Sequence, residues 1–97
     1  MVVGVLRLEL HLHGPENLKE KRSVVKRLLG RCRERFPVSC AEVEYHDLWQ
    51  RTMLGFAVVE HGEPAITALF QKIEAEILRS GELDICATEN EFIHYKG

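Results

Sequence analysis

Residues 18–36 read LKEKRSVVKRLLGRCRERF and predict the element around which the rest of the chain folds. Apolar residues recur there every three or four positions, which is the spacing of one face of a helix. They are Leu18, Val25, Leu28, Leu29, Cys32 and Phe36. Asn17, followed three residues later by Glu20, resembles a capping box, and Pro37 cannot continue a helix. We therefore expect one long amphipathic helix over this stretch, with its apolar face in the core.

The same stretch concentrates positive charge. Between Lys19 and Arg35 it holds eight of the chain's 13 basic residues and two acids, a formal charge of +6, while the whole chain carries −2. Five of the basic residues fall on or near the side opposite the apolar stripe: Lys19, Lys26, Arg27, Arg31 and Arg33. Cations spaced by helical turns can meet successive phosphates of a nucleic acid. The alternative is a solvated face whose charges are balanced by acids elsewhere in the protein.

The overall composition is that of one small globular domain. The 97 residues are 45% hydrophobic and 29% charged, which is ordinary for a folded domain. A net charge of −2 argues against a general nucleic-acid coat and leaves only the local basic surface for that role. No apolar run approaches the roughly 20 residues of a membrane span, and the N-terminus lacks the features of a secretory signal. The three cysteines also stand at unrelated spacings. Together, these features predict a cytoplasmic protein with free thiols.

The rest of the chain predicts four strands and a second helix. Residues 2–12 alternate apolar and polar side chains, and residues 38–46 and 51–60 also show strand periodicity. Residues 64–80 have helical spacing, with a proline in the first turn and a glycine just after the end. A fourth strand follows over residues 83–88, and the tail after it either extends the strand or folds over an edge of the sheet.

The order strand–helix–strand–strand–helix–strand predicts a single ferredoxin-like domain of the α+β class over residues 1–97. Right-handed crossovers place both helices on one face of a four-stranded antiparallel sheet. The first and third strands would then be central. These are also the two strands with apolar residues on both faces, which agrees with central positions.

A family resemblance rests on residues 3–6 (VGVL), 18–22 (LKEKR) and 41–55, which contain AEV, DLWQR and LG. These stretches resemble the YlxP-like family of small bacterial proteins of unassigned function, and the likeness covers nearly the whole chain. The resemblance implies a ferredoxin-like fold and no established activity, cofactor or catalytic residue. Family members are often encoded among translation and ribosome-maturation genes, which favours a role with RNA or the ribosome by association only.

The open face of the sheet offers another binding surface. We expect Leu54, Phe56 and Val58 of the third strand at its centre and consider them a candidate homodimer face. Four carboxylates share this face in the expected register: Glu9, Glu42, Glu44 and Asp84. Because carboxylates repel phosphate, stacking of RNA bases on this face is disfavoured. Alternatively, the C-terminal tail covers the face.

The connection between the second and third strands gathers polar residues near the start of the first helix. The candidate partner-binding loop comprises His46, Asp47, Trp49, Gln50 and Arg51. Tryptophan and arginine are enriched at binding hot spots, whereas Asp47 could equally accept hydrogen bonds from Arg51 or from the backbone of the turn. His11 and His13 are expected at the same end, but without a close-spaced ligand pair the sequence predicts no metal site.

No motif predicts catalysis. The sequence shows no nucleophile in a recognisable setting beside a base, and no glycine loop that cradles phosphate. We therefore expect a cytoplasmic binding protein that is not an enzyme, needs no cofactor and takes no small-molecule substrate. Its expected partner is structured RNA or the ribosome, bound through the first helix. The alternative is a homodimeric protein–protein interaction module that uses the sheet face.

Overall fold

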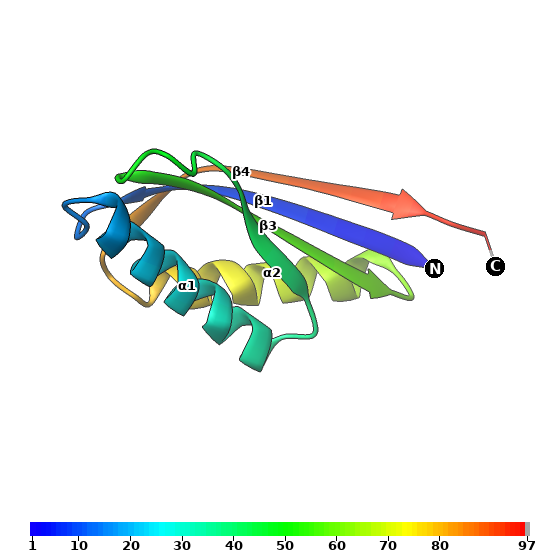
Figure 1. Cartoon of the computed structure of the whole chain (residues 1–97). Helices are drawn as coiled ribbons and strands as arrows, with labels where there is room; N and C mark the ends of the chain where they lie inside the picture. The colour runs from blue at the N-terminus through cyan, green and yellow to red at the C-terminus, as the bar shows by residue number, and fades with distance from the viewer. Residues whose placement is uncertain (97) are drawn as a thin grey trace.

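The computed structural model describes residues 1–96 and has the predicted βαββαβ order (Figure 1). The elements are β1 (Val2–Leu12), α1 (Leu18–Arg35), β2 (Ser39–Glu44), β3 (Arg51–Glu60), α2 (Glu63–Leu78) and β4 (Leu83–His94). The strands form one antiparallel sheet in the order β2-β3-β1-β4, so β1 and β3 are central. Both helices lie on the same face of the sheet and leave the other face open. The ferredoxin-like α+β prediction is confirmed. Within residues 1–96, neither helix combines the length and apolar character needed to cross a membrane.

The ends of α1 follow from its sequence. The Asn17 side chain accepts a hydrogen bond from the backbone N–H of Glu20 at 2.9 Å. The Glu20 carboxylate in turn accepts one from the backbone N–H of Glu16 at 3.0 Å. These bonds satisfy donors that the start of a helix leaves free. The helix is 18 residues long, and Phe36 leaves it with an extended backbone because Pro37 follows.

The core lies between the two helices and the face of the sheet that they cover. Even-numbered residues of β1, among them Leu6 and Leu8, point into this core and are fully buried. Antiparallel pairing sets Phe56 opposite Leu6 and Leu54 opposite Leu8. Residues directly opposite each other project to the same side of a sheet. The pairing of β1 with β3 therefore decides which side of β3 meets the helices.

The predicted homodimer face of Leu54, Phe56 and Val58 is wrong for this reason. All three side chains are buried in the core beneath the helices. Strand β3 is apolar on both faces, so its own sequence could not indicate which set of residues turns toward the helices. The open face carries the other set, which includes Ala57 and the exposed Val59.

A register shift in the edge strand β2 changes which carboxylates share a face. The pairing of β2 with β3 shifts between Glu42 and Glu44. Glu42 turns toward α1 and pairs with Lys21, whereas Glu44 pairs with Arg7 on the open face. The expectation that Glu42 and Glu44 both lie on the open face is therefore wrong, because a bulge breaks the strict alternation of side chains.

The C-terminal tail extends β4. The strand continues beyond Glu89, and its last pairs set Ile93 opposite Val3 and His94 opposite Val2. Of the two alternatives for the tail, strand extension is the one observed. The result is a long edge strand beside β1, with both chain ends at the same end of the sheet (Figure 1).

Candidate functional site

The outer surface of α1 carries cations that the fold does not neutralise. Five of them are exposed and form neither an ion pair nor a side-chain hydrogen bond within residues 1–96: Lys19, Arg22, Lys26, Arg27 and Arg31. We call this group the α1 cation surface. Of the two acids on the helix, Glu20 is engaged in the N-terminal cap. Because these cations have no partner among the described residues, the surface can attract an anionic partner.

One flank of this surface borders the edge strand β2. Arg22 and Lys26 lie one helical turn apart, and Arg33 continues the same side of the helix. Arg33 Nη2 donates a hydrogen bond to the backbone carbonyl of Cys40 in β2 at 2.7 Å. This contact holds the guanidinium at the edge of the sheet. An arginine has five N–H donors, so Arg33 keeps others for a partner.

The opposite flank meets α2 at a buried carboxylate. Glu76 lies 2.8 Å from Arg35 Nε through Oε1 and 3.5 Å from Arg79 Nη1 through Oε2. Within residues 1–96, Oε1 has no hydrogen bond of good geometry despite its short distance to Arg35. The three residues and Arg31 line a hollow of about 260 Å³. With three guanidinium groups and one carboxylate, the hollow extends the positive surface onto α2.

Lys21 contributes to the formal charge of α1, but its side chain is not part of the α1 cation surface. Its side chain is 0% exposed, and its Nζ lies 2.6 Å from Glu42 Oε2. Nζ also donates to the backbone carbonyl of Tyr45 at 2.8 Å, and the Thr52 hydroxyl donates to the same Glu42 oxygen at 2.5 Å. This network ties the first turns of α1 to the connection between β2 and β3.

The predicted partner-binding loop divides into an anchored residue and an exposed stretch. Arg51 pairs with Glu9, so of the two alternatives given for Asp47 the pairing with Arg51 is not observed. The Arg51 guanidinium carbon lies 4.7 Å from the ring centroid of Tyr45. The hydrogen bond to Glu9 raises the pKa of Arg51. The rest of the loop is exposed: His46, Asp47, Leu48, Trp49 and Gln50. Because Lys21 holds the Tyr45 carbonyl, the exposed stretch lies beside the start of the α1 cation surface.

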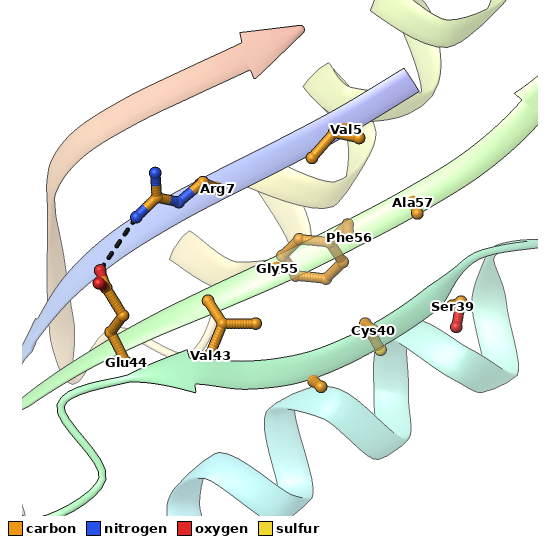
Figure 2. Close-up of a pocket in the computed structure, with 10 residues that line it drawn as sticks. Val5, Arg7, Ser39, Cys40, Val43, Glu44, Gly55, Phe56 and Ala57 are labelled. Carbon is orange, nitrogen blue, oxygen red and sulfur yellow. Dashed lines mark hydrogen bonds and ion pairs between the residues drawn. The ribbon is translucent and has the colours of Figure 1, made fainter. Parts of the chain in front are cut away.

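The open face of the sheet holds an apolar groove of about 520 Å³ (Figure 2). Figure 2 shows that its lining comes from β1, β2 and β3, with apolar side chains from Val5, Val43 and Ala57. The ion pair between Arg7 Nη2 and Glu44 Oε2, 2.9 Å long, lies at one end. The groove is therefore mostly apolar, and its cation, Arg7, is already neutralised by Glu44.

Two of the three cysteines are buried thiols. Burial raises the pKa of Cys32 to about 11 and also raises the pKa of Cys40 above its usual value. The thiolate is the reactive form of cysteine, so both side chains remain protonated at neutral pH. Cys86 is exposed on β4.

Four residues of the positive surface and its hollow were not among the site residues predicted from the sequence: Arg22, Arg35, Glu76 and Arg79. Arg22 could have been found from helical spacing, because it lies one turn before Lys26. Glu76 lies in α2 and Arg79 directly follows this helix, and no local pattern indicates that they lie at the end of α1 beside Arg35.

Comparison with known proteins identifies a family that matches most of the chain. Residues 3–90 match the family described as "Protein of unknown function (DUF503)". The chain belongs to the DUF503 family. One relative is "Uncharacterized protein YlxP" of Bacillus subtilis (strain 168), 34% identical over 91 residues that cover 94% of this chain and 99% of the relative. The family resemblance in the sequence is confirmed, and DUF503 membership brings no assigned activity.

Two solved structures share the DUF503 chain's fold. SnoaB, described as a cofactor-independent oxygenase from Streptomyces nogalater, has a TM-score of 0.52 and 12% identity, covering 99% of this chain and 94% of SnoaB. The de novo designed protein Foldit4 has a TM-score of 0.51 and 14% identity, with coverage of 97% and 99%. At such identities the likeness concerns the fold alone.

Proposed function

We propose that this DUF503 protein binds structured RNA, free or within the ribosome, through the α1 cation surface, and that it catalyses no reaction. The observation that supports this most directly is the group of five exposed cations of α1 that have neither an ion pair nor a side-chain hydrogen bond within residues 1–96. Such a surface releases counterions from a phosphate backbone when it binds, which is the main source of affinity for nucleic acids.

The shape of the surface favours structured RNA over a single strand. At 1.5 Å per residue, the 18 residues of α1 form a rigid rod about 27 Å long. Cations occupy both flanks of this rod, so they can meet phosphates on two sides of a groove. Recognition of double-stranded RNA relies on shape and backbone contacts of this kind. Single-strand binding uses aromatic side chains as stacking platforms, and the α1 cation surface contains none.

The open face of the sheet is a poor alternative site for RNA. Its Arg7 is paired with Glu44 at 2.9 Å and lies 3.4 Å from Glu89. Strand β4 adds the exposed Glu91 on the same face, opposite Val5. Carboxylates in these positions repel phosphate, so the helix layer is the side that RNA approaches.

The test is a comparison of two double charge reversals. Lys26→Glu/Arg27→Glu changes the α1 cation surface, and Lys72→Glu/Lys96→Glu makes the same change of net charge at exposed sites elsewhere. Binding to ribosomal RNA hairpins is measured across a salt series. We expect the α1 variant to lose at least about tenfold in affinity and to reduce the salt slope by roughly two.

The control variant should bind within about twofold of the unmodified protein, because net charge acts weakly over distances beyond a Debye length. A single-stranded RNA of equal length serves as the second probe and should bind more weakly than the hairpins. Equal losses in the two variants, or hairpin binding retained by the α1 variant, would reject the proposal.

A second candidate function is self-association through the open face. Val43 is 45% and Val59 is 59% exposed, and both lie on the face of the sheet that the helices leave uncovered, where the apolar groove also lies. A two-fold axis brings the same patch of two copies together, so an apolar face can cover itself. We expect sedimentation to show a dimer that Val59→Glu dissociates and that Thr67→Glu, exposed on α2, leaves intact. A monomer at high micromolar concentration would reject this function.

A further inference from the structure

Two histidines and an aspartate meet at the end of the sheet where β1 leads into α1. His11 lies in β1 directly opposite Asp84 of β4, and His13 follows two residues after His11. One possible ligand atom from each of the three side chains lies within 4.8 Å of the other two. The His11 and His13 rings meet edge to face with centroids 4.7 Å apart, and His13 Nε2 lies 2.8 Å from Asp84 Oδ2.

We propose that His11, His13 and Asp84 bind a divalent transition-metal ion of the zinc class. Imidazole nitrogen and carboxylate oxygen are ligands that Zn²⁺ accepts at about 2.0–2.2 Å, so neighbouring ligands of a tetrahedral ion lie about 3.3 Å apart. The ligand atoms lie within 4.8 Å of one another, so the farthest pair needs to approach by at most about 1.5 Å to share one ion. Three protein ligands leave one position of a tetrahedral ion for water or for a ligand from a partner.

The backbone at this site is held from both sides. The His13 N–H donates to the Glu82 carbonyl at 2.9 Å, and the Leu12 N–H donates to the Gln50 carbonyl at 2.8 Å. Leu12 is buried in the core and pairs with Leu83, the residue next to Asp84. The Cα positions of the ligands are thus set by the sheet, and only side-chain rotation is needed to close the site.

The nearby charges favour a cation. Arg51 lies opposite His11 on β3, but it is paired with Glu9 and contributes no net repulsion. Asp84 brings a carboxylate to the two imidazoles, and its Oδ2 lies 2.8 Å from His13 Nε2. Without a metal, the contact between His13 and Asp84 is an exposed pair that stabilises the fold little. Two imidazoles beside one carboxylate suit a metal better than they suit a structural role.

This site shares no residue with the proposed RNA-binding surface. It also differs from the sequence analysis, which predicted no metal site. That expectation grouped His11 and His13 with His46 and Asp47. Asp84 lies 71 residues from His13 along the chain, so no spacing pattern could have identified it. Within residues 1–96, neither His46 nor Asp47 belongs to the group of ligand atoms.

The experiment uses the untagged chain in a Cys86→Ser background, which removes the exposed thiol as an adventitious ligand. Co²⁺ is added as a spectroscopic probe of tetrahedral coordination, followed by Zn²⁺ in competition. We expect one Co²⁺ per chain, visible absorption bands typical of tetrahedral cobalt, and a rise in Tm with Zn²⁺ because the metal binds the folded state.

Two ligand variants and one matched control decide the assignment. His13→Gln and Asp84→Asn should each weaken Zn²⁺ binding by at least about tenfold, with circular dichroism showing an unchanged fold. His46→Gln removes an exposed histidine at the same end of the protein and should change the affinity by less than about twofold. Failure of the unmodified background to bind Co²⁺ at millimolar concentration, or equal losses in all three variants, would overturn the proposal.

Discussion

Replacing Lys21 by methionine tests the most unusual contact in the fold. The methionine keeps a similar apolar stem but removes the ammonium group that lies 2.6 Å from Glu42. Glu42 would then be a carboxylate with 15% of its side chain exposed, left with the Thr52 hydroxyl as its hydrogen-bond donor. The backbone carbonyl of Tyr45 would also lose its 2.8 Å bond. The variant therefore leaves a carboxylate and a carbonyl without the group that satisfied them.

The expected loss of stability is large. Removing one partner of a buried ion pair typically destabilises a protein by about 3–5 kcal/mol, and the slight exposure of Glu42 favours the lower value, about 3 kcal/mol. For a domain of this size, 1 kcal/mol corresponds to about 4–8 °C in Tm, so we expect a fall of at least roughly 12 °C. Urea unfolding and thermal scans followed by circular dichroism measure both quantities. Lys26→Met, exposed on the same helix, is the control and should change stability by less than about 0.5 kcal/mol.

A double variant separates the ion pair from packing. In Lys21→Met/Glu42→Leu no charge is left buried, so it should recover at least about half of the stability lost in Lys21→Met. RNA affinity should fall in Lys26→Met and stay nearly unchanged in Lys21→Met, because the exposed Lys26 can reach phosphate and the buried Lys21 cannot. A loss below about 1 kcal/mol for Lys21→Met, or no recovery in the double variant, would refute this account of the network.

Further predictions concern packing and thiol chemistry. Gly4→Ala should lower the free energy of unfolding by about 1–3 kcal/mol in urea titrations, because the added Cβ would overlap with the buried Ile66 side chain. Gly30→Ala should instead raise it by up to about 1 kcal/mol in the same titrations, since an added Cβ on this residue of α1 meets no atom within 4 Å. At pH 8, iodoacetamide should modify Cys32, whose pKa is raised to about 11, more than about a hundredfold slower than Cys86, as followed by mass spectrometry. Comparable rates for the two thiols in the native protein would contradict the burial of Cys32, and equal rates are expected only in denaturant.

The two proposed binding surfaces lie on opposite layers of the molecule. The α1 cation surface belongs to the helix layer, and the groove lies on the uncovered face of the sheet (Figures 1 and 2). Self-association through the sheet would therefore leave both copies of α1 free. A dimer would present two basic helices, and linked binding sites can raise affinity for one long RNA without new contacts.

Most of the fold could be predicted because its signals are local. The apolar spacing of α1, its capping box and the alternation in β1 each lie within a few residues of chain, and each is found in the structure. The open-face residues could not be predicted in the same way. With apolar residues on both sides of β3, the choice between Phe56 and Ala57 for the core depends on its pairing with β1. The bulge between Glu42 and Glu44 likewise moves one carboxylate to the interior without a sequence signal.

By itself, the sequence determined the order of helices and strands and the gathering of positive charge on α1, because both depend on spacing along the chain. Only the tertiary structure decided which charges remain available. Lys21 is withdrawn to a partner on β2, Arg35 is held by α2, and His13 meets an aspartate 71 residues away. These outcomes depend on strand register and helix packing, which bring distant residues within bonding distance and are settled only when the whole core closes.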